Sequence, residues 1–559
     1  MRSSSIGLPY GRVASLAEQD ATQKSVPSLD VGALLRQTIP NLFDERVARA
    51  AERRFLRFPG RDLTYGDVAR ESLIQATVLT GRHGLEPGDY VVTVMENGPE
   101  LVVAAFATWL TGAILVPLDP RLLAEQVESI VSQVQPRVVL ATGFRPTYAG
   151  HPVVAIDLTI HAADSPPPRR APAKPRDPAV VIFTSGTTGR PKGVVLEHGT
   201  LILTSAALAA RSWLGDANDR IYCPWSMSHS TGLRTILGTL HLGAECVIVE
   251  RFQPDRFWRD VEMFSITCTT VLGMSRRIIR AIPDSVRRGG TSLRRVYATP
   301  SFPDSNEAFE NLAVRVAEGY GLTETGQCLV NDDARARPGA IGRPTPYYEI
   351  VLQDDEGHVL QEPGAVGEIC CRPRYPGVIF KEYLGDPKLG MDATRDLWFH
   401  TRDLARRDAD GYYYLSGRKG ETIRRSSEMI SATTVEDVLA KHPLVDICAV
   451  VGVEDAERGE EALAFVSWTT NSGDAEAGEL APADDPGRVT KVADWLALRL
   501  PASWIPRYWV AMPLPDFPLT ISGKVRKHQL LVLSQGRARV DLKAAPGASR
   551  FQLQEEIPK

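Results

Sequence analysis

The sequence lacks the cysteine pattern of a disulfide-rich or zinc-binding protein. Its seven cysteines are odd in number, include no C-x-x-C pair and stand in mostly apolar surroundings. Neither a disulfide framework nor a zinc site is therefore expected, and a reducing cytoplasmic location fits best. The cysteines are Cys223, Cys246, Cys268, Cys328, Cys370, Cys371 and Cys448.

An excess of positive charge is also missing. The formal net charge is -4, and basic clusters such as Arg424-Arg425 are short. A polyanion would find no broad positive field on such a chain, so nucleic acid is not expected as a partner.

No long apolar run is present either. The longest uncharged run, residues 101–118, contains Gly112 and Pro117 and predicts a buried helix, a turn and a strand rather than a membrane span. Residues 1–30 contain Arg2 and several serines but no apolar core of a secretory leader, so we expect a flexible extension there.

The length and composition predict more than one domain. With 559 residues, 43% of them hydrophobic, the chain exceeds what a single core usually sustains. Up to about residue 415, short β-rich runs such as 90–94, 137–140 and 153–156 alternate with amphipathic helical segments, which is typical of α/β folds with parallel-rich sheets. Beyond residue 420, helical spacing at 432–441 and a buried strand at 447–453 indicate a smaller α+β domain.

We therefore expect an α/β architecture with a large N-terminal domain of αβ layers and a small mobile C-terminal domain. The predicted division is a flexible extension at 1–30, a large domain at 31–417, a small domain at 418–534 and a tail at 535–559.

An apolar strand is expected at 179–183, immediately before the segment 184–193, which is rich in glycine and hydroxyl side chains. Glycines let the backbone approach a ligand, while hydroxyls, backbone N–H groups and cations bind phosphate oxygens. The segment is not a Walker A loop, because Pro191 stands at the second glycine and Gly193 follows Lys192. It predicts a polyphosphate cradle formed by Thr184, Ser185, Gly186, Thr187, Thr188, Gly189 and Lys192.

A second motif, residues 318–325, reads E-G-Y-G-L-T-E-T after the strand-like residues 314–316. It is not a dinucleotide fingerprint, because Glu324 stands where the third glycine would be.

The 184–193 loop resembles the phosphate-binding signature of the adenylate-forming superfamily, which includes acyl-CoA synthetases, aryl-CoA ligases, luciferases and peptide-synthetase adenylation domains. The other motifs occur in the order of that family: Y-G-x-T-E at 320–324, a T-G-D-like block at 401–403, G-R at 417–418 and P-x-T-x-x-G-K at 518–524. The resemblance covers about residues 43 to 531, and the segment 250–258 is similar to carnitine-CoA-ligase-like members.

The resemblance implies ATP-dependent activation of an organic acid to an acyl-AMP, release of pyrophosphate and transfer to coenzyme A, with Mg²⁺ as the metal. It also implies the roles of single residues. Thr323, His229 and Lys524 would be catalytic, Glu324 would hold Mg²⁺, and the nucleotide would contact Gly319, Tyr320, Gly321, Asp403 and Arg418. Thr323 would bind the α-phosphate, His229 would lie near the carboxylate, and Lys524 would stabilise charge as adenylation proceeds.

The sequence departs from the family pattern at positions that bear on the acceptor. Ser426, Ser427 and Met429 replace the residues of a G-G-E-N-like turn that shapes the approach of the thiol. Arg402 replaces the glycine of the T-G-D block, and Gly420 occupies the hinge, where glycine remains compatible with rotation.

Two other readings are considered, of which the first follows from these departures. In one, the acyl-AMP is consumed without coenzyme A, by amide formation or by nitrite-dependent diazotisation of an aromatic amine. In the other, the chain binds ATP or acyl-AMP without catalysis. No aspartate of the kind that holds the substrate amine in peptide-synthetase domains is evident around residues 224–233, which favours a plain acyl or aryl acid. The identity of that acid is left open.

We predict that Lys524→Ala lowers the rate of adenylation by about a hundredfold or more, because a preorganised cation is removed from the developing charge. ATP should still bind. Acid-dependent pyrophosphate exchange measures the step, and a near-normal exchange rate in the variant would contradict the role of Lys524.

Overall fold

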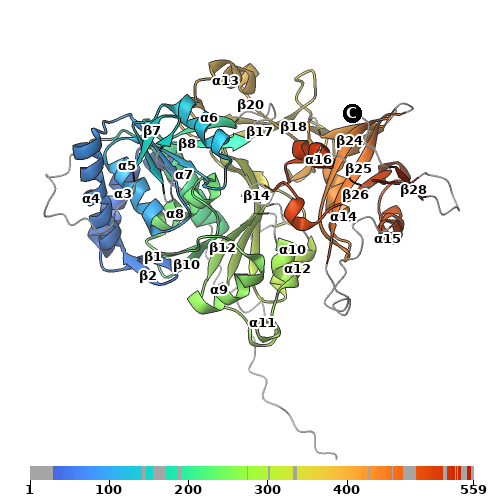
Figure 1. Ribbon diagram of the computed structural model, residues 1–559, viewed down its shortest axis with the longest axis horizontal. Coiled ribbons are helices and arrows are strands. Elements are labelled where there is room, and N and C mark those ends of the chain that lie inside the picture. Colours follow the sequence, from blue (N-terminus) through green and yellow to red (C-terminus); the bar gives the residue numbers. More distant parts are fainter. Residues whose placement is uncertain are drawn as a thin grey trace, which may run out of the picture.

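The computed structural model describes residues 29–141, 147–154, 171–185, 191–272, 275–299, 303–331, 336–419, 421–425, 428–455, 458–469, 486–519, 525–534, 537, 539–542 and 551–554. Within these ranges the strands form four sheets (Figure 1). Three sheets lie before residue 419, and the fourth is built from residues after 421.

The first sheet is parallel between β14 and β1 and antiparallel at both edges. Across the sheet its strands are β16 (Arg343–Pro344), β15 (Gly326–Asn331), β14 (Arg315–Leu322), β13 (Arg295–Thr299), β12 (Cys268–Leu272), β10 (Arg220–Cys223), β11 (Glu245–Ile248), β1 (Arg54–Phe58) and β2 (Arg61–Thr64).

The second sheet is parallel from β8 to β7 and antiparallel elsewhere. Its strands in spatial order are β19 (Glu382–Tyr383), β9 (Pro191–Glu197), β8 (Pro178–Ser185), β4 (Ile114–Leu118), β3 (Tyr90–Val94), β5 (Val138–Ala141), β7 (His151–Val154) and β6 (Thr147–Tyr148).

The third sheet is antiparallel and consists of β17 (Tyr348–Gln353), β18 (Val366–Pro373), β20 (Phe399–Arg407) and β21 (Tyr413–Arg418). The fourth sheet is antiparallel except where β25 pairs with β26. Its strands are β22 (Thr422–Arg425), β23 (Glu428–Ser431), β24 (Val445–Asp455), β25 (Gly459–Trp468), β26 (Tyr508–Ala511), β27 (Arg539–Leu542) and β28 (Phe551–Gln554).

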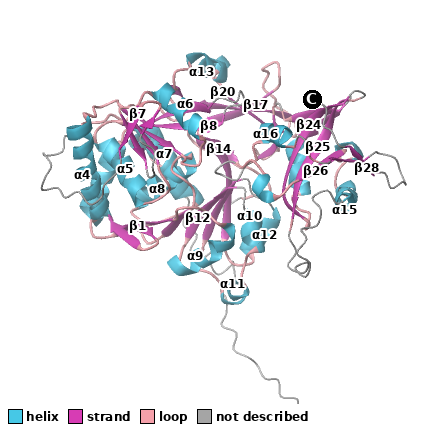
Figure 2. Cartoon of the chain, in the orientation of Figure 1, coloured by secondary structure: helices cyan, strands magenta, loops and turns pink. Residues whose placement is uncertain are grey.

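Helices form layers around the first two sheets (Figures 1 and 2). The central layer, between the sheets, contains α3 (Ile39–Ala50), α4 (Tyr65–His83), α5 (Pro99–Leu110), α7 (His198–Ala207) and α8 (Ser230–Leu242). The outer layers are α6 (Ala124–Val134) on the second sheet and α9 (Phe257–Phe264), α10 (Ser275–Arg280) and α12 (Pro303–Glu310) on the first. The remaining α-helices are α2 (Val31–Leu35), α11 (Asp284–Gly289), α13 (Pro387–Ala393), α14 (Ala432–Leu439), α15 (Pro486–Ala497) and α16 (Lys527–Leu533).

Helix α5 shows why this layering forms. Every residue of α5 except Glu100 is buried, so the helix needs apolar partners on all sides, and both sheets supply them. Its Trp109 Nε1 donates to Ala179 O on β8 at 2.9 Å. The expected helix, turn and strand in residues 101–118 are confirmed as α5, a left-handed Gly112 and β4.

The expected α/β class, with a large domain of parallel-rich sheets and a smaller C-terminal domain, is confirmed. The division at 417/418 stays a prediction. Between the two parts, Arg280 Nη1 and Nη2 on α10 donate to Val445 O on β24 at 3.3 and 3.2 Å. None of the helices in the described ranges is both long and apolar enough to cross a membrane.

The strand that was expected to precede the 318–325 motif extends into it. Strand β14 does not stop near residue 316 but continues to Leu322, because it forms an antiparallel hairpin with β15. The hairpin needs glycine: a Cβ on Gly321 would lie 1.8 Å from Gly326 O, and one on Gly319 would lie 2.8 Å from Leu329 O. Close backbone approach therefore explains both glycines of the motif.

Asn97 ties the two large sheets together. It follows β3 of the second sheet, and its buried Nδ2 donates to Trp225 O at 3.3 Å and to Val249 O at 3.2 Å. These two carbonyls follow β10 and β11 of the first sheet.

We predict that Asn97→Ala lowers the free energy of unfolding by about 1–3 kcal/mol, because two buried carbonyls lose their donor. Urea titration followed by tryptophan fluorescence measures the change. Asn218→Ala, at an exposed loop position, is the control. Equal midpoints for the two variants would contradict the role of Asn97.

Candidate active site

The acidic residue of the second motif lies between two sheets. Glu324 follows β14 and is buried, and its Oε1 accepts a hydrogen bond from the Tyr383 hydroxyl at 2.8 Å. Lys192 Nζ on β9 lies 3.5 Å from the same oxygen and donates to the Tyr383 hydroxyl at 3.3 Å. Burial, together with the charge of Glu324, raises the pKa of Tyr383 far above its usual range. The phenol therefore stays protonated and acts as a donor to Glu324.

Glu324 fits a hard divalent cation. The hydrogen bond from Tyr383 and the ion pair with Lys192 both involve Oε1 of this carboxylate. A single carboxylate, completed by waters and substrate phosphates, is a usual environment for Mg²⁺.

Thr323 stands at the junction of this cluster with α8. Its hydroxyl lies 3.4 Å from Ser230 Oγ, at the first turn of α8. His229 caps the same helix, and its Nδ1 accepts the Thr231 N–H at 3.1 Å. When this imidazole is neutral, its proton therefore lies on Nε2. The structure thus brings His229, Thr323 and Glu324 to one region.

Sequence reasoning missed Arg234, whose side chain contacts the backbone of Thr323. Its Nη2 donates to Thr323 O at 2.9 Å, and its Nε donates to Thr204 Oγ1 at 3.2 Å. The guanidinium is buried, which lowers its pKa to about 10, and the charge of Glu324 opposes that shift. Arg234 therefore fixes the backbone of the turn that presents Thr323 and Glu324. An arginine inside the otherwise apolar part of a helix was the available signal.

The other nucleotide candidates also meet. The Tyr320 hydroxyl donates to Asp403 Oδ2 at 2.6 Å, and Arg418 Nε lies 3.4 Å from Asp403 Oδ1. Asp403 and Arg418 face each other across β20 and β21. Burial, with the adjacent Asp403 charge, raises the pKa of Tyr320 well above its usual range, so its hydroxyl is a constant donor.

The two strands that flank the phosphate loop pair with each other in antiparallel fashion. Strand β8 ends at Ser185, β9 begins at Pro191, and Thr184 pairs with Lys192 across the two strands. Thr184 Oγ1 is buried and finds no hydrogen-bond partner among the described residues. An unsatisfied hydroxyl beside a lysine suits a phosphate oxygen. Several predicted site residues lie outside the described residues: Gly186, Thr187, Thr188, Gly189 and Lys524.

A cavity of about 340 Å³ opens at the carboxyl ends of β3, β4, β10 and β11. Its walls carry Trp225 and Phe252 as well as charged side chains of both signs, including Arg251. Leu519 and Arg526, which flank the segment 520–524, also line it. Carboxyl ends of parallel strands are the usual place for ligands in α/β proteins.

Comparisons with known proteins agree with this arrangement. The family model described as "AMP-binding enzyme" matches residues 43–384, and that of the "AMP-binding enzyme C-terminal domain" matches residues 434–524. A crotonobetaine/carnitine-CoA ligase of Escherichia coli O17:K52:H18 (strain UMN026 / ExPEC) is 31% identical over 412 residues, which cover 68% of this chain and 79% of that protein.

Solved structures share the fold. The anthranilate CoA ligase AuaEII with anthranoyl-AMP superposes with a TM-score of 0.80 at 22% identity, covering 90% of this chain and 98% of that one. The o-succinylbenzoate CoA synthetase of Bacillus subtilis with its acyl-adenylate gives 0.74 at 23% identity, covering 88% and 98%. From its two matching domains and this similarity, the chain belongs to the AMP-binding enzyme family.

Proposed function

We propose that this chain is an ATP-dependent, AMP-forming ligase that converts an organic carboxylate into an acyl-AMP and then transfers the acyl group to coenzyme A. One observation carries the proposal: the Tyr320–Asp403–Arg418 cluster and the Glu324–Lys192–Tyr383 cluster stand at the same end of β14. The first suits a nucleoside and the second suits phosphates with a metal. The relatives named above are CoA ligases, which supports the acceptor.

In the first half-reaction, a carboxylate oxygen of the acid attacks the α-phosphorus of ATP. The bond to the β-phosphate breaks, and pyrophosphate leaves. Thr184 and Lys192 contact the departing phosphates, while the Thr323 hydroxyl holds the α-phosphate. Glu324 would hold Mg²⁺, which neutralises phosphate charge when bound. Asp403 and Arg418 orient the ribose, so that the α-phosphorus faces the acid.

In the second half-reaction, the thiol sulfur bonds to the acyl carbon, the carbon–oxygen bond to AMP breaks, and the thiol proton is released. The 340 Å³ cavity is the route we propose for this second substrate, because Ser226, which stands just before α8 in the sequence, lines it together with Leu519 and Arg526. His229 donates its backbone N–H to Ser226 O at 3.0 Å, which places it next to a residue of the cavity wall, and we propose that the acid carboxylate sits near it.

We predict that Glu324→Gln raises the Mg²⁺ concentration needed for half-maximal turnover by about tenfold or more, because the amide keeps the shape but loses the charge that a hard cation prefers. Pyrophosphate release at varied Mg²⁺ measures the effect. Glu382→Gln, at the exposed neighbour of Tyr383 on β19, is the matched control. Superimposed titrations of parent and Glu324→Gln would exclude Glu324 as the metal ligand.

The acid is found by screening pyrophosphate release across fatty, aryl and amino-aryl acids, with and without coenzyme A and with and without nitrite. Activity with none of these acids would leave only ATP or acyl-AMP binding. Consumption of the adenylate that is indifferent to coenzyme A would favour the amine or nitrite reading.

We further predict that Gly420→Pro slows thioester formation while leaving adenylation largely intact, because proline fixes the φ angle on which rotation of the small domain depends. Single-turnover mass spectrometry, with coenzyme A as the sole added nucleophile, separates the two steps. A thioester formed by the parent at a rate comparable with adenylation supports coenzyme A as acceptor. Persistent acyl-AMP in the parent would overturn it.

A further inference from the structure

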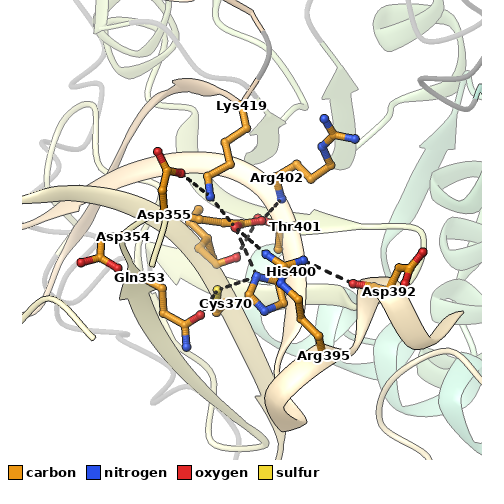
Figure 3. A network of polar contacts seen from close by, with 12 residues as sticks. Gln353, Asp354, Asp355, Cys370, Asp392, Arg395, His400, Thr401, Arg402 and Lys419 are labelled. Carbon is orange, nitrogen blue, oxygen red and sulfur yellow. Dashed lines mark hydrogen bonds and ion pairs between the residues drawn. The ribbon is translucent and has the colours of Figure 1, made fainter. Parts of the chain in front are cut away.

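A buried carboxylate that no motif identified lies beside the nucleotide candidates. The side chain of Glu368 on β18 is 1% exposed. Figure 3 shows the polar network to which its partners Lys419, His400 and Arg402 belong. Its Oε1 accepts the Arg402 backbone N–H at 2.8 Å. Its Oε2 lies 3.0 Å from Lys419 Nζ, 3.2 Å from His400 Nδ1 and 3.5 Å from an Arg395 nitrogen. A carboxylate so deeply buried is stable only with several partners of this kind.

The two oxygens of Glu368 bind residues in two different strands or strand ends, Arg402 in β20 and Lys419 after β21. Arg402 immediately precedes Asp403, and Lys419 immediately follows Arg418. Asp403 and Arg418 face each other across β20 and β21. Each of them is therefore next in sequence to a residue that is hydrogen-bonded to Glu368. The Lys419 N–H also donates to Arg402 O at 2.7 Å, which closes the connection between the two strands.

Arg402 is held in a backbone conformation that arginine rarely adopts. Its φ is +65°, in the left-handed region where glycine is usually found. Such a residue keeps its conformation only when the surrounding structure imposes it. Here Glu368 Oε1 holds its N–H and the Lys419 N–H holds its carbonyl, while Asp403 N donates to Thr401 Oγ1 at 3.1 Å. Loss of Glu368 removes the first of these restraints.

A metal site is the competing explanation for this cluster, because Glu368, Cys370 and His400 offer ligand atoms within 4.8 Å of one another. The contacts oppose it. Glu368 already faces the cationic side chains of Lys419 and Arg395, which would repel a further cation. Burial also raises the pKa of the Cys370 thiol to about 12, which disfavours the thiolate form that a metal would bind.

We propose that Glu368 is a positioning residue that fixes Asp403 and Arg418 together and thereby sets the preference of the site for a complete ribose. The proposal rests on the nucleotide-binding role given to these two residues above. Through Oε1 the carboxylate holds the left-handed turn that aims Asp403, and through Oε2 it holds the strand end that carries Arg418.

The test compares equilibrium binding of ATP and 2′-deoxy-ATP by calorimetry, without any acid. Glu368→Ala should weaken ATP binding by about tenfold, the size expected for loss of a charged hydrogen bond that orients the ribose contact. Binding of 2′-deoxy-ATP should change much less, so the ratio of the two affinities falls. Weakening of both nucleotides by the same factor would show a merely structural role and overturn the proposal.

Companion variants separate the effect of the Oε1 contact to Arg402 from that of the Oε2 contact to Lys419. Arg402→Gly placed in the Glu368→Ala background should restore part of the affinity ratio, because glycine adopts the left-handed turn without help. Lys419→Met leaves Glu368 in place and should lower the ratio by a smaller factor through Arg418. It keeps the proposal testable if Glu368→Ala does not fold, which thermal unfolding reveals. An unchanged ratio in Lys419→Met and no restoration by Arg402→Gly would both count against the proposal.

The matched control is Glu349→Ala on the adjacent strand β17, whose carboxylate pairs with Arg372 outside the network. It should leave both affinities unchanged. A parent protein that binds neither nucleotide would contradict the proposed ligase function. A parent that prefers ATP, with the same preference in Glu368→Ala, would contradict only the positioning role.

Discussion

Compensation of buried negative charge organises this protein around its candidate site. Glu324, which follows β14 of the first sheet, pairs with Lys192 and accepts a hydrogen bond from Tyr383, both on the second sheet. Asp403 of the third sheet accepts a hydrogen bond from Tyr320 on the first sheet. Because an unpaired carboxylate in these positions would be costly, each pair constrains where one sheet lies relative to another. The same contacts that satisfy the carboxylates therefore bring the phosphate, base and ribose candidates to a common end of β14.

The local parts of this site could be predicted from the sequence, because each motif is a short segment with recognisable chemistry. The phosphate loop, the Tyr320 motif and the Asp403 block are of this kind. The residues that hold these motifs in place through tertiary contacts could not be predicted. Tyr383 comes from a strand of two residues, and Arg234 and Glu368 act through contacts that form only when separate elements pack together. The replacement at Arg402 was visible in the sequence, but its left-handed backbone was not.

The helical layer between the sheets serves the site as well as the core. Helix α8 presents His229 and Ser230 at its first turn, while one turn further along Arg234 reaches the Thr323 carbonyl. A single helix thus contacts both the hydroxyl and the carbonyl of Thr323, and its apolar residues pack in the main core. This dual use limits how far the turn can move while the core is intact.

The position of β1 in the first sheet has a consequence for how the chain emerges from the ribosome. Residues 54–58 complete their parallel pairing only with β11 at residues 245–248, so almost two hundred residues are synthesised before that partner exists. During this interval the apolar faces of α5 and β4 have only part of their final cover. Such delayed, non-local pairing makes nascent chains slow to fold and prone to aggregation. Slower translation or chaperone binding over this stretch would therefore favour the recovery of folded protein.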